Sequence, residues 1–466
     1  MNAPICGPPD PTFARGPLPG YLDHARIGPL SPRAAAALTA ATAPAGRADP
    51  ADLDRLFALG DAARDSAARL LGARPHEIAL VPSTSNGLFT VAAALHGPGT
   101  VLVPRGEFPA NIYPWLRFAG RGGPDVRLLD PDGPRHITPD LLRRHLTPDV
   151  TALTVSAVDS LTGHLAPLAA LKELLGPDRL LIVDAIQGLG AVPLEADAAD
   201  VLVSGGQKWL RAGWGAALLL IRDRCGERLA PGLGGWAGVT DPFAVRHPAP
   251  SLPGAAAHLA TNPDFPAAAA IGAAVDDLLD KGGPAAAGVR IRSTLAKLLD
   301  RARQAGAEIL SDGLGPRERA GIGSFHLPGH DPAGVHRALA AAGVITTRRD
   351  RWIRLSPHTS TPAGAVDLFA EALRALTHRT PRTHGNTRVD TTPATPATPT
   401  STTGITDPGT GTGTSTSTST STSTSTEIGT HAKAQSQAQS QARSHSQTNA
   451  PTSTLTDAQE SPCPTS

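Results

Sequence analysis

Short runs of consecutive apolar residues recur in the first half of the chain and predict buried β-strands. Each run is too short and too continuously apolar for an amphipathic surface helix. Strands that are apolar along their whole length are typical of a parallel sheet covered on both faces. The runs lie at residues 101–103, 153–158, 180–183, 201–203 and 216–221.

Helical spacing of Ala and Leu appears before and between these runs, at residues 52–71 and 165–175. Strands that alternate with helices along the chain favour an α/β architecture, in which helices cover both faces of the sheet. Ligands of such sheets bind outside the carboxyl ends of the strands. We therefore expect the functional side chains at those strand ends.

The pattern changes after about residue 250 and predicts a smaller α+β domain. Residues 267–279 and 291–307 have helical spacing, residues 345–355 are typical of one or two strands, and residues 363–376 indicate a closing helix. No repeat with a period of about 20 to 50 residues is present, which argues against a solenoid.

From residue 380 onward, Thr, Ser, Pro, Gly and Gln replace the apolar residues. Such a segment buries too little apolar surface to offset the entropy lost on ordering, so we expect it to be disordered. A phosphorylated or partner-binding tail is the alternative. The predicted organisation is an N-terminal segment at 1–20, a large α/β domain at 21–255, a small α+β domain at 256–379 and a tail at 380–466.

The charge balance and the few cysteines narrow the class of protein. The 466 residues include 42 Lys and Arg against 41 Asp and Glu, which argues against a globally basic nucleic-acid binder. No apolar run reaches the roughly 18 residues of a membrane span, and the first residues lack an export signal. Three scattered cysteines do not suit a disulfide framework or a zinc cluster. We expect a cytoplasmic protein without a metal site.

Two strand ends bring an acid and a lysine to one predicted edge of the sheet. Asp184 closes one apolar run, and Lys208 follows the next. Lysines are scarce in this chain, and the apolar residues Trp209 and Leu210 come directly after this one. Burial beside such residues lowers the pKa of a lysine and makes it an amine nucleophile able to form a Schiff base. An ordinary salt bridge with Asp184 is the alternative.

A third group of polar residues precedes a predicted helix. The stretch Ser-Thr-Ser-Asn-Gly at 83–87 lies between an apolar run at 78–81 and helical spacing over 88–95. The free N–H groups and the dipole of a helix N-terminus bind phosphate; a simple N-cap is the alternative. A nucleotide site is disfavoured, because no P-loop lysine and no G-x-G-x-x-G stretch accompany it. An acid, an amine and a phosphate cup are together the groups that pyridoxal 5′-phosphate (PLP) requires.

The arrangement of these residues resembles the class V aminotransferase family, which includes cysteine desulfurases, kynureninases and isopenicillin N epimerase-like proteins. The resemblance covers residues 21–376 and begins with Tyr-Leu-Asp-His-Ala at 21–25. Its specific part is Asp-Ala-Ile-Gln at 184–187 combined with Gln-Lys-Trp at 207–209. The resemblance implies an enzyme with PLP as its cofactor and the α/β architecture of PLP fold type I.

The resemblance also implies a role for each matching residue around the cofactor. Lys208 forms the Schiff base and moves the proton at the substrate's Cα. Asp184 keeps the pyridine nitrogen protonated, and Gln187 bonds the phenolic oxygen of the ring. Thr84 and Ser85 fall where the family holds the phosphate.

Four further residues complete the implied site. Phe108, in the stretch 107–115, stacks on the ring; a core position is the alternative. Ser160 stands where the family has an Asn near the cofactor oxygen, and Gln207 belongs to the phosphate side. Arg354 follows an apolar pair and grips the substrate carboxylate; a surface arginine is the alternative.

Two departures from the family pattern narrow the function. Residues 343–351, the loop before the arginine strand, contain no cysteine, which argues against a desulfurase that forms a persulfide. Gly205 replaces the serine of the family's S-G-H-K motif and leaves the phosphate contacts on that side open.

We therefore expect a PLP-dependent enzyme that acts on an amino acid through a Cα carbanion, with aminotransfer as the first expectation. β-Elimination with C–S cleavage and epimerisation are alternatives, because they share this carbanion. A PLP-fold protein that binds an amino acid for regulation is the non-enzymatic alternative. Thr261 and Asn262 lie where the family receives a phosphate contact from a neighbouring subunit, which predicts a homodimer.

Overall fold

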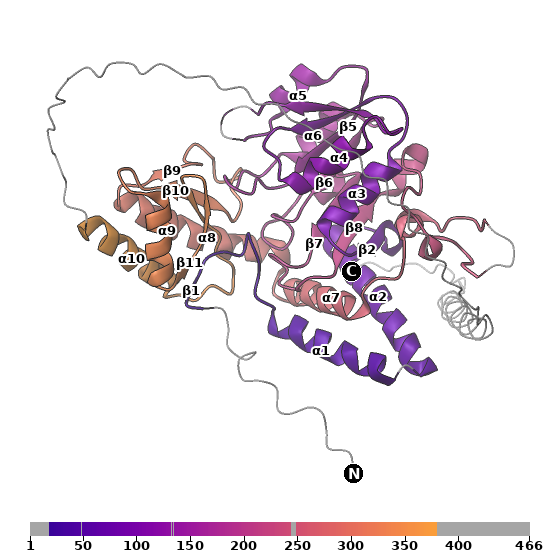
Figure 1. The fold of residues 1–466 in the computed structure, drawn as a ribbon, viewed down its shortest axis with the longest axis horizontal. Coiled ribbons are helices and arrows are strands. Elements are labelled where there is room, and N and C mark those ends of the chain that lie inside the picture. Colours follow the sequence, from indigo (N-terminus) through magenta and orange to yellow (C-terminus); the bar gives the residue numbers. More distant parts are fainter. Residues whose placement is uncertain (1–17, 48, 132, 134, 244–247, 380–466) are drawn as a thin grey trace, which may run out of the picture.

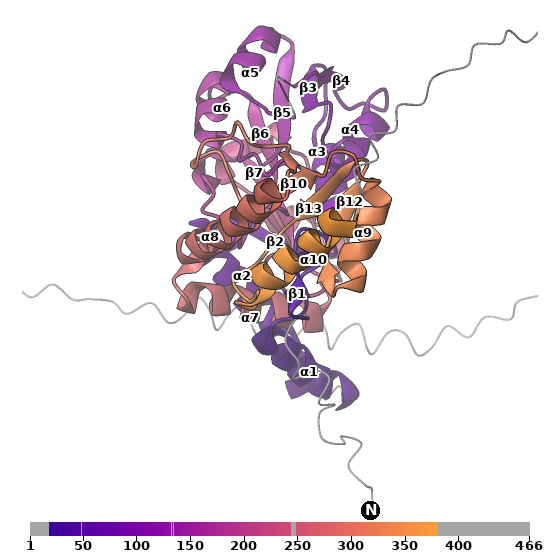
Figure 2. The same ribbon diagram turned by 90° about the vertical axis from the view of Figure 1, so that its left-hand side faces the viewer.

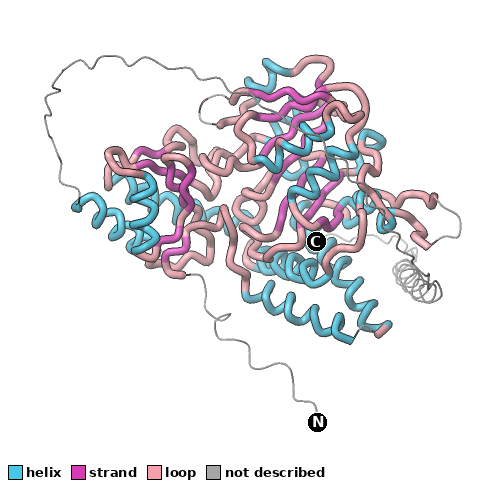
Figure 3. Tube along the Cα trace, viewed as in Figure 1, coloured by secondary structure: helices cyan, strands magenta, loops and turns pink. Residues whose placement is uncertain are grey.

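The computed structural model describes residues 18–47, 49–131, 133, 135–243 and 248–379. Most of the predicted N-terminal segment and the whole predicted tail, 380–466, lie outside the described residues. Two units lie side by side, one built on a seven-stranded sheet and the other on a four-stranded sheet (Figure 1). Figure 3 shows strands flanked by helices in both units.

The seven-stranded sheet confirms the α/β architecture, with one strand running against the others. Its strands are β2 (Ile78–Val81), β3 (Thr100–Pro104), β4 (Asp125–Leu129), β5 (Val150–Ser156), β6 (Leu180–Asp184), β7 (Val201–Gly205) and β8 (Ala217–Ile221). The strand order is β2-β8-β7-β6-β5-β3-β4, and β8 is antiparallel to both neighbours. The expectation of a parallel strand at 216–221 is therefore wrong. The connection from β7, residues 206–216, contains no helix and is too short for a parallel crossover.

Helices cover both faces of this sheet. One face carries α2 (Pro50–Leu71), α5 (Pro139–His145), α6 (Leu168–Leu175) and α7 (Phe265–Asp280), and the other carries α3 (Thr84–Ala94) and α4 (Tyr113–Phe118). Side chains alternate between the faces along each strand: Leu181 and Val183 of β6 pack with α2 and α6, whereas Ile182 packs with α3. None of the helices that the structure describes is long and apolar enough to cross a membrane.

Helix α7 packs with the larger unit. It contacts both α1 (Pro32–Arg47) and α2, and Figure 1 shows the three helices together below the sheet. Ala268 and Ile271 of α7 belong to the same buried cluster as Ala67 of α2. The domain boundary predicted between residues 255 and 256 stays a prediction.

The smaller unit contains an antiparallel sheet with the strand order β12-β13-β10-β9. Its elements are α8 (Gly283–Gln304), β9 (Glu308–Ile309), β10 (Gly323–His326), α9 (Pro332–Ala341), β12 (Thr347–Arg349), β13 (Trp352–Leu355) and α10 (Ala365–Arg379). Figure 2 shows its three helices gathered against the strands. Phe325 and Phe369 meet edge to face in its core, with ring centroids 5.7 Å apart. The α+β pattern expected for this part of the chain is confirmed.

The N-terminal part of the chain joins the smaller unit before it enters the larger one. Strand β1 (Gly20–Tyr21) pairs in parallel with β11 (Val344–Ile345). Ser356 N then donates to Leu22 O at 2.8 Å, and Ala25 N donates to Ser356 Oγ at 3.0 Å. Residues 23–25 therefore lie at the seam between the two units, next to the carboxyl edge of the large sheet.

Candidate active site

A buried acid ends strand β6. Asp184 is paired in register with Ser156 of β5 and is 2% exposed. Its Oδ1 accepts a hydrogen bond from Ile186 N at 3.0 Å. Burial raises the pKa of Asp184, while the Ile186 N–H and the positive charge of Lys208 oppose that shift. The predicted strand-end acid is therefore present, and a cationic ligand would favour its charged form.

The candidate nucleophile lies on the same sheet edge, in the connection between β7 and β8. Burial lowers the pKa of Lys208 to about 8; Asp184 opposes this shift, and the positive charge of Arg354 adds to it. Lys172 and Lys281 form ion pairs, but Lys208 forms none with a carboxylate in the described part of the chain. The alternative of an ordinary salt bridge with Asp184 is therefore wrong. A fraction of this amine is uncharged near neutral pH and able to attack an aldehyde.

An aromatic ring covers this amine. The ring centroid of Phe108 lies 5.7 Å from Lys208 Nζ. Phe108 is 49% exposed, so the alternative of a core position is wrong. A partly exposed ring beside a partly buried amine is a surface on which a flat cofactor ring could stack.

The N-terminus of α3 meets the end of β7. Ser83 caps the helix with its Oγ, so the N-cap interpretation holds for this residue. Thr84 is buried, and its Oγ1 accepts a hydrogen bond from Gly205 N at 2.8 Å. Ser85 is exposed in the first helical turn. The two residues predicted to hold the phosphate, Thr84 and Ser85, therefore lie beside the segment that precedes the candidate nucleophile.

The absent side chain at position 205 leaves space that Gln207 occupies. A methyl group on Gly205 would overlap with Oε1 of Gln207 and would lie 3.1 Å from Thr84 Oγ1. The side-chain amide of Gln207 is therefore folded back toward Thr84, on the predicted phosphate side. A polar group is thus present where a serine at 205 would have stood.

Two hydrogen bonds fix the orientation of Gln187. Its Nε2 donates to Ala25 O at 2.9 Å, and its Oε1 accepts from Trp209 Nε1 at 3.0 Å. An amide nitrogen carries two N–H groups, so one can donate to a further acceptor. The contact with the phenolic oxygen of the cofactor stays a prediction.

Arg354 of β13 lies buried at the seam, which excludes the alternative of a surface arginine. Its Nη2 pairs with Asp23 Oδ1 at 3.3 Å, and its Nη1 donates to the backbone carbonyl of Ser160 at 2.9 Å. Ser160 thus reaches the site through its backbone. Nε of Arg354 is buried and has no hydrogen-bond partner among the described residues. A buried guanidinium with a donor to spare is suited to bind a carboxylate.

Asp23, the ion-pair partner of Arg354, is a residue for which no role was predicted from the sequence. Asp23 lies 331 residues from Arg354 along the chain, and its two oxygens also accept hydrogen bonds from Thr347 Oγ1 at 2.9 and 2.7 Å. The acid follows an apolar residue and precedes His24 in the sequence. That local pattern indicates a buried acid, but no spacing could have pointed to its partners.

Two other titratable side chains border the site and were not singled out from the sequence. His24 is fully buried and stacks on His358 with ring centroids 4.8 Å apart; burial lowers the pKa of His24 to about 3. The carboxyl group of Glu107 accepts hydrogen bonds from Ser156, and burial raises the pKa of Glu107 to about 7. Both residues directly adjoin a residue of the site, Asp23 in one case and Phe108 in the other.

The described cysteine does not supply a reactive thiol. Cys225 is buried, its Sγ donates to Asp200 O at 3.4 Å, and burial raises its pKa to about 11. Cys6 and Cys463 lie outside the described residues. Within the ranges that the structure describes, no group of three or more His, Cys, Asp or Glu side chains could hold a metal ion.

Comparison with solved structures defines the class of fold. The chain matches an apo cysteine desulfurase from Thermococcus onnurineus NA1 with a TM-score of 0.68 and 17% identity, over 78% of this chain and 98% of that one. It matches C-DES, in a mutant with glycine covalently linked to the PLP cofactor, with a TM-score of 0.70 and 21% identity, over 78% and 97% of the two chains. The architecture is that of PLP fold type I.

The family model for aminotransferase class V matches residues 43–350, and the chain belongs to this family. Kynureninase of Deinococcus radiodurans is 31% identical over 227 residues, which are 47% of this chain and 54% of the kynureninase. A probable hercynylcysteine sulfoxide lyase of Mycobacterium tuberculosis is 30% identical over 346 residues, 69% of this chain and 80% of the lyase. Isopenicillin N epimerase of Streptomyces clavuligerus is 28% identical, over 68% of this chain and 84% of the epimerase. The chain spans about half the length of the kynureninase.

The residues at this sheet edge fit PLP, the cofactor that family membership indicates. Lys208 would offer an amine of lowered pKa to the aldehyde. Asp184 would offer a buried carboxyl group to the pyridine nitrogen, and the N-terminus of α3 would offer N–H groups to the phosphate. The unpaired Nε of Arg354 offers a donor to a substrate carboxylate.

Proposed function

We propose that this chain is a PLP-dependent enzyme that acts on the α-amino group of an amino acid, with aminotransfer as its reaction. The observation that carries the proposal is a pair of cations, Lys208 at the carboxyl edge of the large sheet and Arg354 at the seam between the two units. Lys208 has no ion-pair partner among the described residues and a pKa of about 8, so it can react. Arg354 is held by Asp23, and its Nε has no hydrogen-bond partner among the described residues, so it can bind a further acceptor.

The bound cofactor would supply an electron sink that stabilises negative charge at the substrate Cα. Asp184 would hold the ring nitrogen in its protonated form. Thr84, Ser85 and Gln207 would hold the phosphate, and Phe108 would cover one face of the ring.

Arg354 would orient the substrate. Its guanidinium would bind the α-carboxylate, while Asp23 and the carbonyl of Ser160 prevent it from rotating away. This position would bring the Cα–H bond to Lys208 Nζ, which takes the proton as a general base. In aminotransfer, water would supply the oxygen of the keto acid that leaves, and a second keto acid would accept the α-amino group to complete the turnover.

Absorbance and product analysis on the purified full chain test this proposal. We expect a cofactor band that borohydride bleaches and that changes with one member of a panel of L- and D-amino acids. The accompanying product should be a keto acid, with the cofactor recovered in its amine form. Absence of a band after PLP is added would contradict the proposal.

β-Elimination with C–S cleavage is a second candidate, favoured by two observations. The described cysteine thiol is buried and of raised pKa, so a persulfide-forming desulfurase reaction has no nucleophile there. The probable hercynylcysteine sulfoxide lyase matches 69% of the chain. Elimination would release ammonia, a keto acid and the β-substituent, and would leave the cofactor unchanged. Ammonia release from S-substituted cysteines, without the amine form of the cofactor, would favour this candidate.

A homodimer is the proposed assembly. Large apolar side chains are exposed in the segments that follow Lys208: Trp214 is 66% exposed, Leu233 49% and Trp236 41%. Exposed apolar patches of this kind are typical of interfaces. A second copy covering them is consistent with the role expected for Thr261 and Asn262 at the neighbouring site. Sedimentation should show a dimer that the substitution Trp214→Ser weakens; a monomeric native chain would contradict the proposal.

A further inference from the structure

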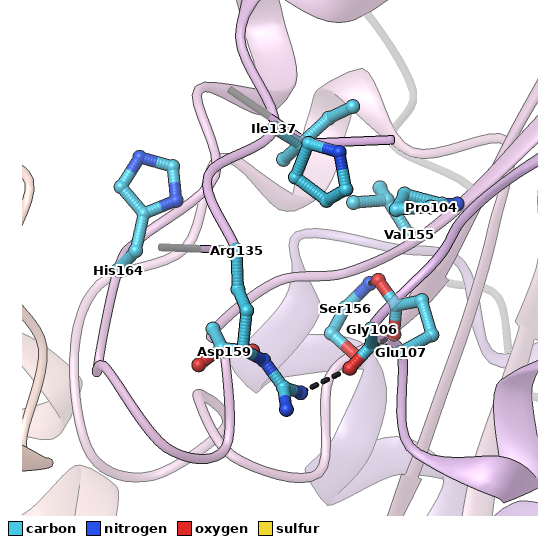
Figure 4. Close-up of a pocket in the computed structure, with 10 residues that line it drawn as sticks. Pro104, Gly106, Glu107, Arg135, Ile137, Val155, Ser156, Asp159 and His164 are labelled. Atoms are coloured by element: carbon cyan, nitrogen blue, oxygen red, sulfur yellow. Dashed lines mark hydrogen bonds and ion pairs between the residues drawn. The ribbon is translucent and has the colours of Figure 1, made fainter. Parts of the chain in front are cut away.

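Glu107 ties two strand ends together beside the candidate site. It follows β3, and its Oε1 accepts a hydrogen bond from Ser156 N, at the end of β5, at 2.7 Å. Its Oε2 accepts a second hydrogen bond from Ser156 Oγ. Figure 4 shows Glu107 beside Ser156, at the rim of a cavity of about 20 Å³. Both carboxylate oxygens are thus engaged by one residue of the neighbouring strand.

The two residues that this tie connects each adjoin a member of the candidate site. Ser156 is the register partner of Asp184 on β6. Phe108 directly follows Glu107 and places its ring 5.7 Å from Lys208 Nζ. The tie therefore connects the backbone that carries the aromatic wall to the strand next to the buried acid.

A second contact holds the same segment from the opposite side. Arg135 donates to the backbone carbonyl of Gly106 and to Asp159 Oδ2, the latter at 2.8 Å (Figure 4). The backbone before Phe108 is thus fixed at Gly106 by Arg135 and at Glu107 by Ser156. Phe108 itself is half exposed and has little packing of its own to fix it.

We propose that Glu107 is a positioning residue: its carboxyl group clamps the segment that carries Phe108 to the end of β5, and thereby fixes the aromatic ring over the amine of Lys208. The inference rests on the proposed function, because it gives that ring its purpose as a wall of the cofactor site.

The electrostatic setting of Glu107 is compatible with a clamp that works uncharged. Burial raises its pKa to about 7, the hydrogen bonds from Ser156 oppose the shift, and the negative charge of Asp184 adds to it. A glutamine is the neutral isostere of this acid and can both accept from Ser156 N and donate to Ser156 Oγ. An alanine can do neither, and an aspartate is shorter by one methylene.

The first measurement uses the cofactor-free full chain and needs no PLP. Acetic anhydride acylates uncharged amines, and mass spectrometry gives the rate at Lys208 relative to the exposed Lys281 of the same molecule. We expect Glu107→Ala and Phe108→Ala each to raise this ratio several-fold, and the double variant to raise it no further. Glu107→Gln should leave the ratio within about twofold of the native value, because glutamine can keep the hydrogen bonds to Ser156. Non-additive effects in the double variant indicate that Glu107 acts through Phe108.

An unchanged ratio in Glu107→Ala, or additive effects in the double variant, would overturn the clamp. If Glu107→Ala fails to fold, as judged by circular dichroism and sedimentation, the pair Glu107→Asp and Glu107→Gln decides. The clamp predicts that Glu107→Asp raises the acylation ratio of Lys208 to Lys281, because the shorter side chain loses the contact with Ser156. Glu107→Gln should leave this ratio as in the native chain. A raised ratio in Glu107→Gln and a native ratio in Glu107→Asp would contradict the clamp.

The second measurement is the dissociation constant for PLP, by equilibrium dialysis of the same variants. We expect weakening of about tenfold in Glu107→Ala, about threefold in Ser156→Ala, which keeps the backbone donor, and less than about twofold in Glu107→Gln. A native chain that binds no PLP while the acylation pattern holds would refute the proposed function and leave the clamp standing. A native chain that binds PLP with unchanged affinity in Glu107→Ala would refute the clamp alone.

Discussion

The carboxyl edge of the large sheet holds a partly buried cation without an ion-pair partner, whereas the seam between the two units holds a buried cation that is paired. At the edge, Lys208 has no ion-pair partner among the described residues, and burial lowers its pKa to about 8. At the seam, Arg354 is paired with Asp23, and both side chains are almost completely buried. An unpaired, partly desolvated amine loses its proton readily, whereas a paired guanidinium stays charged. The presence or absence of one carboxylate thus separates the reactive role proposed for Lys208 from the binding role proposed for Arg354.

The exposed pair Lys281 and Asp277 gives the comparison a reference point. Its two charges are 2.6 Å apart on one helix end, and the lysine side chain is 63% exposed. Water and salt screen such a pair, so it contributes little. The three cations therefore differ in burial and pairing, and each predicts a different consequence of substitution.

Substitution of the unpaired buried lysine should have the largest effect. Lys208→Ala should abolish covalent attachment of PLP and lower turnover by about four orders of magnitude or more, because no other described amine lies beside Asp184. Borohydride reduction followed by mass spectrometry checks the attachment, and Lys281→Ala is the matched control. A reducible adduct that persists in Lys208→Ala would break the assignment.

Removal of the carboxylate at the seam should have the next largest effect. Asp23→Ala leaves the charge of Arg354 buried without compensation, so we expect a loss of about 3–5 kcal/mol in the free energy of unfolding. Denaturant titration measures it. Asp23→Ala should also weaken amino-acid binding, since Arg354 loses its anchor. A loss below about 1 kcal/mol would show that water enters the seam and that the pair is not truly buried.

The buried imidazole at the seam predicts a dependence of stability on pH. Burial lowers the pKa of His24 from 6.5 to about 3, so between these values the unfolded chain binds the proton more readily than the folded one. The stability that His24 contributes is complete above pH 6.5 and is lost progressively as the pH falls toward 3. His24→Phe keeps a ring on His358 but removes the titration. In His24→Phe, the free energy of unfolding measured by denaturant titration should fall less steeply as the pH is lowered from 6.5 toward 3. The same slope in the native chain and in His24→Phe would contradict this prediction.

The smallest effect is expected at the exposed pair. Lys281→Ala should change the free energy of unfolding by no more than about 0.5 kcal/mol, less still at high salt. Thermal or denaturant unfolding at two salt concentrations measures this value. A loss comparable to that of Asp23→Ala would mean that burial is not what distinguishes the seam from the surface.

The same contrast explains which parts of the molecule could be predicted from the sequence. The positions of Asp184 and Lys208 were predictable because Asp184 directly ends one continuous apolar run and Lys208 follows the next run after four residues, and such runs indicate buried strands. The direction of β8 was not predictable from its apolar run, because such a run does not indicate which way a strand points. Only the short, helix-free connection at 206–216 indicates that direction. Strand β4 was not predicted, because Arg127 interrupts its apolar residues. A strand at the edge of a sheet, such as β4, does not need a continuous apolar run.

The seam could not be predicted in its particulars, because its parts come from opposite ends of the described chain. The local patterns indicate that Asp23 and Arg354 are buried, but nothing in their spacing along the chain connects them. The family resemblance predicted that Arg354 binds a carboxylate, but it predicted no ion pair between Arg354 and Asp23. Likewise, the stretch 107–115 suggested the aromatic wall at Phe108, while the tie from Glu107 to Ser156 became visible only with the two strands in place.

The pairing of β1 with β11 has a consequence for the order of events during synthesis on the ribosome. Residues 20–25 emerge more than 300 residues before their hydrogen-bond partners at 344–356. The large sheet can assemble while the chain is still being synthesised, but residues 20–25 cannot pair until residues 344–356 have been made. Closing so long a loop is slow and entropically costly. A nascent chain can therefore place Lys208 on the large sheet before Asp23 can pair with Arg354, and that pair forms only after strand β13 has been made.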